Sequence, residues 1–221
     1  MSDRLDLKFV VPLQGRFVRD WKSDGIEVKV LDDVLEVVKR IVNPQEHATE
    51  EFKLLRVSYA GDCELWKSVQ GRFIKPGTMQ QVAAGDLLYS NIRATDGAIG
   101  VVPAHFDGAL VSESFTVLRA KTNVDAMYLW SILRSFEIRS DIMSPSTGTG
   151  RYTTDWSVTG KVLIPWIKES ERKKVAQGLL QAWKLREESV QAEIKATASL
   201  GSLKLNSQLS LERFESYKPP Q

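Results

Sequence analysis

The chain has 221 residues, of which 43% are hydrophobic and 26% charged, and its formal net charge is +2. This composition is that of a globular protein with one sizeable core, or with one core and an appendage. No stretch approaches the ~20 apolar residues that a membrane-spanning helix needs, so we expect no membrane partner. The first residues lack an apolar run behind a basic cluster, so we expect no secretory signal either.

The single cysteine, Cys63, excludes an internal disulfide framework. A lone thiol suits a reducing compartment, so we expect a cytoplasmic protein. The net charge is a weak argument for nucleic acid, because a strongly basic balance is the usual sign of a DNA-binding chain. If DNA is the partner, positive charge must therefore be arranged locally.

Residue composition and hydrophobic periodicity divide the chain into four segments. A polar lead-in occupies residues 1–22, and a domain punctuated by glycines occupies 23–166. A charged segment with helical periodicity follows at 167–200, and a tail occupies 201–221.

Short β-like runs fill the second segment, where β-branched or aromatic residues alternate with polar ones or form brief apolar stretches. The clearest runs are Lys53–Tyr59, Leu87–Ile92, Ala98–Val102 and Ser114–Leu118. Apolar residues that share one helical face predict helices at 31–38 and at 124–136. We therefore expect an α+β fold, in which one twisted-sheet domain is followed by a long C-terminal helix.

The segment from Lys168 to about Leu200 changes to a helical period. Its apolar residues recur at spacings of four, four, seven and four, and they form one stripe: Val175, Leu179, Trp183, Val190 and Ile194. A helix of about 32 residues extends roughly 48 Å, longer than a small domain is wide. We therefore expect it to pack against a partner helix. A helix folded back on its own domain is the alternative that the sequence leaves open.

The stretch from Gly85 to Pro103 is the most informative part of the chain. Its pattern predicts a turn at a glycine, then a strand, a polar loop tip and a second strand that returns. Asn91, Arg93 and Thr95 lie at the tip, where side chains can reach outward. Gly97 and Gly100 permit a positive φ or the close approach of another backbone. A β-hairpin with a merely solvated tip is the alternative reading.

This stretch resembles the target-recognition domain of type I restriction–modification specificity (S) subunits. The family pattern Gly-Asp-(Leu/Ile)-x-x-Ser-x-Ile-Arg, followed by Gly-x-x-Gly-x-Val, is matched by Gly85, Asp86, Ser90, Ile92, Arg93, Gly97, Gly100 and Val101. Further segments that resemble the family in order are 111–118, 126–129, 146–152 and 162–165. The resemblance covers about residues 21–200.

The resemblance implies a DNA-recognition role without catalysis. A separate methyltransferase (M) subunit would bind S-adenosylmethionine and carry out the methyl transfer. A restriction (R) subunit is a further partner that the resemblance allows. A full specificity subunit has two recognition domains, whereas this chain has no second copy of the glycine-punctuated segment. It therefore resembles a half-subunit, which could form a homodimer through its C-terminal helix.

We recognise no catalytic or metal-binding motif in the sequence. Asn43–Glu46 is the nearest string to an adenine-methyltransferase motif, but it lacks the second proline and the aromatic residue, so we expect a turn. Gly148–Gly150 lacks the helix that follows a cofactor loop. Asp62–Lys67 loosely resembles a nuclease core, but we expect solvated loop charge there, and the two histidines have no patterned neighbours. We expect no bound cofactor and no metal site.

DNA-contacting residues are expected in loops beside glycine or small polar residues. Arginine there can bond guanine in the major groove, and hydroxyl or amide groups can bond phosphates or adenine. The candidates are Lys67, Arg72, Lys75, Ser90, Asn91, Arg93, Thr95, Thr147, Thr149, Arg151 and Tyr152. Two other functions stay open: a protein–protein adaptor with an oligomerising helix, and a nuclease subunit whose site is unrecognised.

Overall fold

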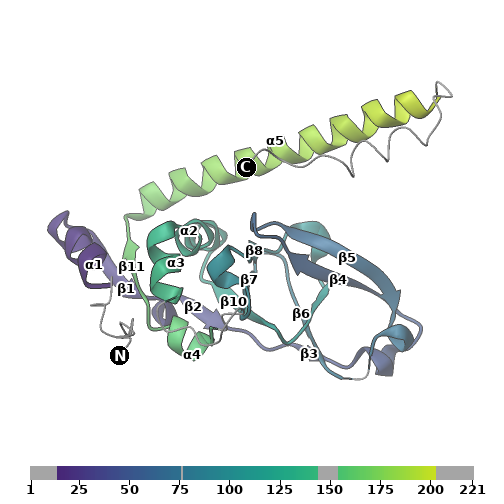
Figure 1. Ribbon diagram of the computed structural model, residues 1–221, viewed down its shortest axis with the longest axis horizontal. Helices are drawn as coiled ribbons and strands as arrows, with labels where there is room; N and C mark the ends of the chain where they lie inside the picture. The colour runs from purple at the N-terminus through teal and green to yellow at the C-terminus, as the bar shows by residue number, and fades with distance from the viewer. Residues whose placement is uncertain (1–13, 76, 144–153, 203–221) are drawn as a thin grey trace, which may run out of the picture. The chain divides into compact units, whose positions relative to one another are not determined.

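The computed structural model describes residues 14–75, 77–143 and 154–202. The chain forms two compact units, residues 1–176 and 177–221. The first unit contains all the strands that the structure describes, and Figure 1 labels most of them. Within the described ranges, no helix is both long enough and apolar enough to cross a membrane.

Within the described residues of the first unit, the N-terminal helix leads into a strand that pairs with the last strand of that unit. Helix α1 (Gln14–Ser23) leads into strand β1 (Glu27–Val30), which pairs antiparallel with β11 (Leu163–Trp166). The predicted lead-in is thus helical from Gln14 onward. This pairing brings the two ends of the first unit together in a two-stranded sheet.

The helix predicted at 31–38 is wrong. The chain forms a short 3₁₀ helix, η2 (Leu31–Asp33), and then strand β2 (Leu35–Val37). The backbone N–H of Leu31 donates to Val162 O at 3.1 Å, and β2 pairs with β10. The branched Val34, Val37 and Val38 suit a strand as well as a helix, and these tertiary bonds decide between the two.

A four-stranded antiparallel sheet forms the centre of the first unit. Its strand order is β2-β10-β7-β8, with β7 (Leu87–Ser90), β8 (Ile99–Val101) and β10 (Phe115–Ala120). These strands confirm three of the predicted runs. Helix α2 (Asn123–Leu133) packs on β8 and β10. The helix predicted at 124–136 ends at Leu133, and a second helix, α3 (Phe136–Met143), follows.

A five-stranded sheet extends the first unit, with the order β3-β6-β9-β4-β5. Its members are β3 (Ile41–Val42), β4 (Glu51–Val57), β5 (Cys63–Gln70), β6 (Met79–Gln81) and β9 (Leu110–Val111). All pairs are antiparallel except β4 with β9. Strands β4 and β5 form the long two-stranded ribbon seen in Figure 1, and β5 is an edge strand.

Apolar side chains cover both faces of β4. Leu54 packs with Phe52, Ile74 and Leu110, whereas its neighbour Leu55 packs in a second cluster that includes Leu88. Consecutive strand residues point to opposite faces, so the ribbon carries a core on each side. Both clusters connect β4 to other elements of the first unit.

Helix α5 (Glu169–Ser202) confirms the long C-terminal helix expected from the sequence. Its first turn lies in the first unit, where Arg172 Nε donates to Asp125 Oδ1 of α2 at 2.8 Å and both side chains are buried. In the second unit, Leu179 and Trp183 are half-buried and Leu180 and Leu185 are exposed. The side chains of Val190 and Ile194 lie outside the described ones, so the partner of this stripe stays a prediction.

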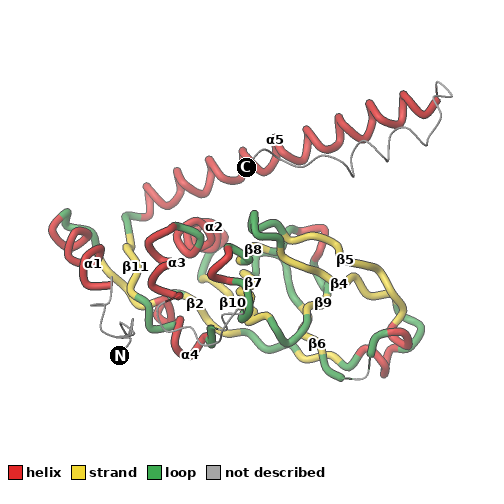
Figure 2. The backbone as a smooth tube through the Cα atoms, in the orientation of Figure 1, coloured by secondary structure: helices red, strands yellow, loops and turns green. Residues whose placement is uncertain are grey.

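Short helices connect these elements. They are η3 (Pro44–His47), η4 (Gly71–Phe73), η5 (Ala94–Asp96), η6 (Ala104–Phe106) and α4 (Trp156–Thr159). The turn predicted at Asn43–Glu46 is η3, and the Asn43 side chain accepts a hydrogen bond from Gln45 N at its start. Figure 2 shows that most of these helices interrupt loops at the margins of the sheets.

Candidate nucleic-acid interface

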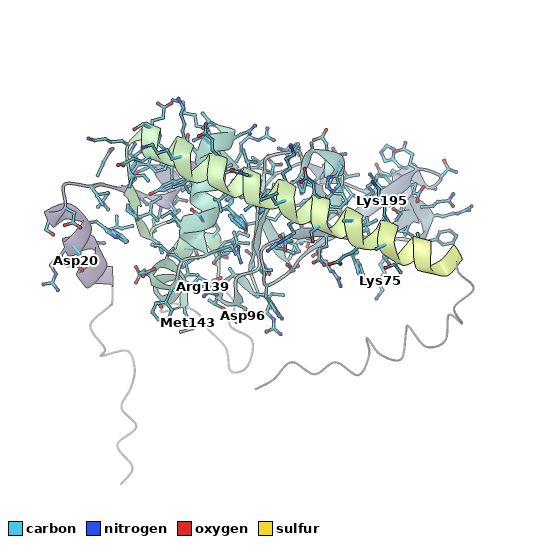
Figure 3. The ribbon with its side chains drawn as sticks, turned by 90° about the horizontal axis from the view of Figure 1, so that it is seen from above. Asp20, Lys75, Asp96, Arg139, Met143 and Lys195 are labelled. Atoms are coloured by element: carbon cyan, nitrogen blue, oxygen red, sulfur yellow. The ribbon has the colours of Figure 1, made fainter. Side chains whose placement is uncertain are left out.

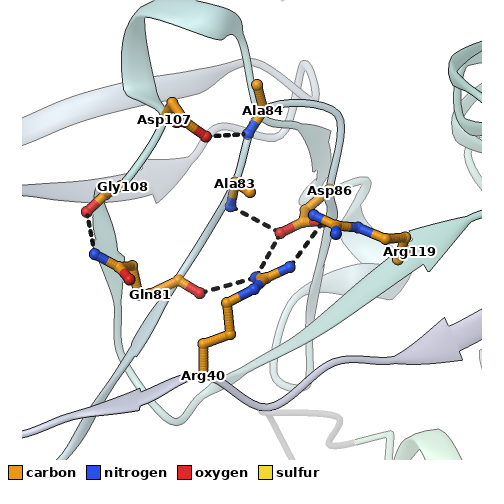
Figure 4. Close-up of polar contacts among 8 residues, drawn as sticks. All are labelled: Arg40, Gln81, Ala83, Ala84, Asp86, Asp107, Gly108 and Arg119. Carbon is orange, nitrogen blue, oxygen red and sulfur yellow. Dashed lines mark hydrogen bonds and ion pairs between the residues drawn. The ribbon is translucent and has the colours of Figure 1, made fainter.

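The Gly-Asp pair before β7 has a structural role. Gly85 has a φ of +84°, which a residue with a side chain rarely adopts. Asp86 has no exposed surface, and its carboxylate accepts hydrogen bonds from Ala83 N at 2.8 Å, Arg40 Nη1 at 2.8 Å and Arg119 Nη2 at 2.7 Å (Figure 4). Arg40 precedes β3, and Arg119 lies on β10, so this carboxylate joins the two larger sheets.

The loop between β7 and β8 is held tightly at its base. Ser90 Oγ accepts a hydrogen bond from Arg93 N at 3.2 Å, and Ala98 N donates to Arg93 O at 3.0 Å. Gly97 ends η5 with a φ of +101°, as the sequence led us to expect. The Asn91 side chain accepts a hydrogen bond from Thr116 Oγ1 on β10 at 2.8 Å. These bonds hold the base of the loop and place Arg93 at its tip.

The turn between β4 and β5 packs against the same loop. Trp130 Nε1 of α2 donates to Ile99 O at 2.8 Å and to Gly61 O at 3.3 Å, so one indole joins the two segments. A Cβ built on Gly100 would lie 2.7 Å from the Cys63 Sγ. Gly100 is therefore required for the close approach of β8 to β5.

A surface groove of about 590 Å³ lies between these two loops. One wall comes from β4, its turn and β5, and the other comes from the β7–β8 loop and from Ser114 and Phe115. The groove is lined by Arg56, Val57, Ser58, Tyr59, Glu64, Ser90, Ile92, Arg93, Ala98, Ser114 and Phe115. It is an open concave site with both polar and apolar walls.

Two oriented arginines lie in this groove. Arg93 Nη1 is 2.9 Å from Asp96 Oδ2, and its guanidinium lies 5.8 Å from the centre of the exposed Tyr59 ring. The hydrogen bond to Asp96 raises the pKa of Arg93 further, so this side chain stays charged at any physiological pH. Arg56 Nε is 2.8 Å from Glu64 Oε2 across the strand pair. Each guanidinium is thus directed by a neighbouring carboxylate.

The structure brings some of the predicted residues together and separates others. Asn91, Arg93 and Thr95 share the β7–β8 loop, whereas Ser90 is buried on β7 and supports that loop. Lys67 lies in strand β5 and not in the predicted loop, because Asp62–Lys67 runs into that strand. Figure 3 shows Lys75 well away from Asp96 along the molecule. The candidates Thr147, Thr149, Arg151 and Tyr152 lie outside the described residues.

Sequence reasoning missed part of the groove wall: Arg56, Ser58, Tyr59 and Glu64. Tyr59 ends a strand-like run and precedes Ala60 and Gly61, which is a typical turn sequence. The turn itself could therefore be predicted from the sequence. Its approach to β8 could not be predicted, because it depends on the long-range contact of Trp130 with Gly61 and Ile99.

Cys63 is the one cysteine of the sequence, and it lies at the start of β5. Burial raises the pKa of the Cys63 thiol to about 12, so the thiol is neutral and unreactive. Among the described residues, no group of three or more His, Cys, Asp or Glu side chains is placed to hold a metal ion.

Solved structures provide the comparison for this fold. No protein-family model and no curated protein matches the chain. The HsdS subunit of Thermoanaerobacter tengcongensis superposes with a TM-score of 0.59 and 21% identity over 80% of this chain and 47% of that one. The chain has the HsdS fold.

Two further structures share this fold. A chain from a study of the assembly and conformational transition of the type I R-M system gives a TM-score of 0.60, with 19% identity over 88% of this chain and 51% of that one. The type I S subunit from M. genitalium gives 0.52, with 14% identity over 80% of this chain and 44% of that one. The chain therefore spans about half the length of each of these proteins.

Proposed function

We propose that this chain reads a short sequence in double-stranded DNA for a type I-like restriction–modification system. The observation that carries the proposal is the groove between the β4–β5 turn and the β7–β8 loop, on a fold shared with HsdS subunits. Arg93 and Arg56 are charged donors in this groove, and Ser58 and Ser114 offer hydroxyl groups. Such a mixture suits the pattern of donors and acceptors on base edges.

Arg93 is the residue to which we assign base reading. Its guanidinium is exposed, and Asp96 and Tyr59 hold it in a defined direction, so little side-chain entropy is lost when it binds. An arginine can donate two hydrogen bonds to O6 and N7 of guanine. One such contact discriminates against the wrong base by about 1–3 kcal/mol. Recognition of this kind needs no chemistry in the chain itself.

The catalytic step is assigned to another polypeptide. We propose that a separate methyltransferase subunit binds S-adenosylmethionine and modifies adenine, and that this chain is not an enzyme and positions that subunit on its target. Helix α5 (Glu169–Ser202) would serve as the spacer that fixes the distance to a second recognition domain, on a homodimer partner or on another subunit. A restriction subunit is a further partner of the assembly, and a cytoplasmic location follows from this role.

Selection from a pool of random DNA duplexes tests the proposal. The full-length chain is incubated with duplexes that carry a randomised core, and the bound fraction is sequenced over several rounds. We expect one short motif to be enriched in separate selections. A bound fraction with the base composition of the starting pool would refute sequence recognition.

A further inference from the structure

Three exposed aromatic rings, one in the β4–β5 ribbon and one just beyond each end of β5, each have a cation over or beside the ring. Tyr59, Trp66 and Phe73 are 59%, 60% and 66% exposed. Arg93 lies 5.8 Å from the Tyr59 ring, Lys67 Nζ 4.5 Å from the Trp66 ring and Arg72 4.8 Å from the Phe73 ring. The first pair belongs to the groove described above. The other two pairs lie further along the ribbon, beyond the groove.

Trp66 is directed outward by an irregularity in the strand pair. Leu54 pairs with Lys67 and Leu55 pairs with Leu65, so Trp66 is the extra residue of a β-bulge. A bulge redirects a side chain and increases the local twist of the strand. It also interrupts the edge of the sheet, which makes β5 a poor template for the addition of another strand. Addition of a β-strand at this edge therefore does not account for the exposed indole.

The charge of this region suits a polyanion. Residues 63–75 contain three cations, Lys67, Arg72 and Lys75, and one carboxylate, Glu64, which is matched by Arg56. Within the described part of the chain, none of these three cations forms an ion pair. The groove arginines differ, because each is already held by a carboxylate. Cations that form no ion pair can meet phosphates without first breaking one.

We infer that Trp66, Lys67, Arg72, Phe73 and Lys75 form an outer strip that binds the sugar–phosphate backbone of DNA beside the bases read in the groove. The inference rests on the proposed function. Lys67 lies three residues before the end of β5, and Arg72 follows in η4. At about 3.3 Å per strand residue, the strip extends on the order of 10 Å along β5 alone, enough to reach more than one phosphate of one DNA strand. The cations contact phosphates, and the two rings pack against deoxyribose. The strip supplies affinity and orientation, and the groove supplies sequence preference.

The salt dependence of binding tests the cations of the strip. The triple variant K67Q/R72Q/K75Q is compared with K22Q/K121Q/K174Q, which removes the same charge from exposed lysines elsewhere. Fluorescence anisotropy gives the Kd of each full-length variant for one fixed 24-bp duplex between 50 and 200 mM salt. We expect the slope of log Kd against log salt to fall by about 2–3 in the strip variant only. Equal slopes for the two triple variants would overturn the inference.

The rings are tested with W66L and F73L, which replace exposed side chains and should leave the circular dichroism spectrum unchanged. Each is expected to weaken binding several-fold and by the same factor for every duplex sequence. A loss confined to one sequence would overturn the assignment of these rings to the backbone.

The experiments distinguish a failure of the proposed sequence recognition from a failure of the proposed outer strip. If the chain binds all duplexes alike and the strip variant loses salt dependence, the outer strip stands and sequence recognition falls. If a motif is selected and the strip variant keeps the wild-type slope, recognition stands and the strip falls. A chain that binds no duplex contradicts both.

Discussion

Asp86 and Arg40 lie 46 positions apart in the sequence, yet their side chains form an ion pair of 2.8 Å in which the carboxylate has no exposed surface. Arg119 completes this cluster from β10. The aspartate that resembles a family signature therefore joins two sheets and is not available to contact DNA.

Replacing Asp86 should destabilise the first unit. Asp86→Asn keeps the shape of the side chain but leaves two guanidinium groups without their counter-charge, and we expect a loss of about 2–4 kcal/mol in the free energy of unfolding. Urea unfolding followed by circular dichroism measures it. Asp33→Asn, at an exposed carboxylate, is the control and should change stability by less than about 0.5 kcal/mol. Equal effects of the two changes would show that the buried cluster does not stabilise the fold.

Alanine substitutions at two glycines should change the stability of the protein in opposite directions. Gly100→Ala should cost about 1–3 kcal/mol, because the added methyl group meets the Cys63 Sγ and a Val57 methyl group. Gly178→Ala in α5 meets no atom within 4 Å, and it should gain about 0.5–1 kcal/mol in helix stability. Thermal unfolding followed at 222 nm checks both. A neutral Gly100→Ala variant would contradict the close packing of β8 on β5.

Periodicity predicts the long elements well because a single local pattern decides them. The apolar stripe that begins at Val175 predicted the helix that is now α5, and the alternation in Lys53–Tyr59 predicted the strand that is now β4. The same reasoning failed at residues 31–38, where Leu31, Val34 and Leu35 fit a helical face. Hydrogen bonds from the backbone of Leu31 and Asp32 to the distant Val162 and Gly160 hold the short helix η2, and pairing with β10 holds Leu35–Val37 as a strand.

The groove could be predicted only in part. The tip residues Asn91, Arg93 and Thr95 stand in one glycine-bounded segment, so their proximity is local. The opposite wall from Arg56 to Glu64 depends on the packing of the β4–β5 turn on Trp130 and β8, which no local pattern encodes. The pairs Trp66-Lys67 and Arg72-Phe73 are adjacent in the sequence, but the exposure of their rings follows from the bulge and the sheet edge.

The apolar stripe of α5 is expected to mediate association. Replacing Leu179 and Val190 together with aspartate should abolish self-association or the binding of a partner subunit, because charged groups in an apolar helix contact are costly. Gln177→Asp with Ser189→Asp, at exposed positions of the same helix, is the control. Light scattering gives the mass of each variant with and without partner. If the Leu179/Val190 variant has the wild-type mass in both conditions, this stripe is not an interface.

The energy of each base substitution in the selected motif tests the central claim, that the groove reads bases through Arg93, most directly. Binding of the motif and of all its single-base variants is measured for the wild type, for Arg93→Ala and for Lys174→Ala, an exposed lysine of α5. We predict that Arg93→Ala removes about 1–3 kcal/mol of discrimination at one base pair and leaves the other positions intact, while Lys174→Ala keeps the full pattern. If Arg93→Ala and Lys174→Ala instead lower affinity for every duplex by a common factor, Arg93 does not read a base, and the groove is not the recognition site.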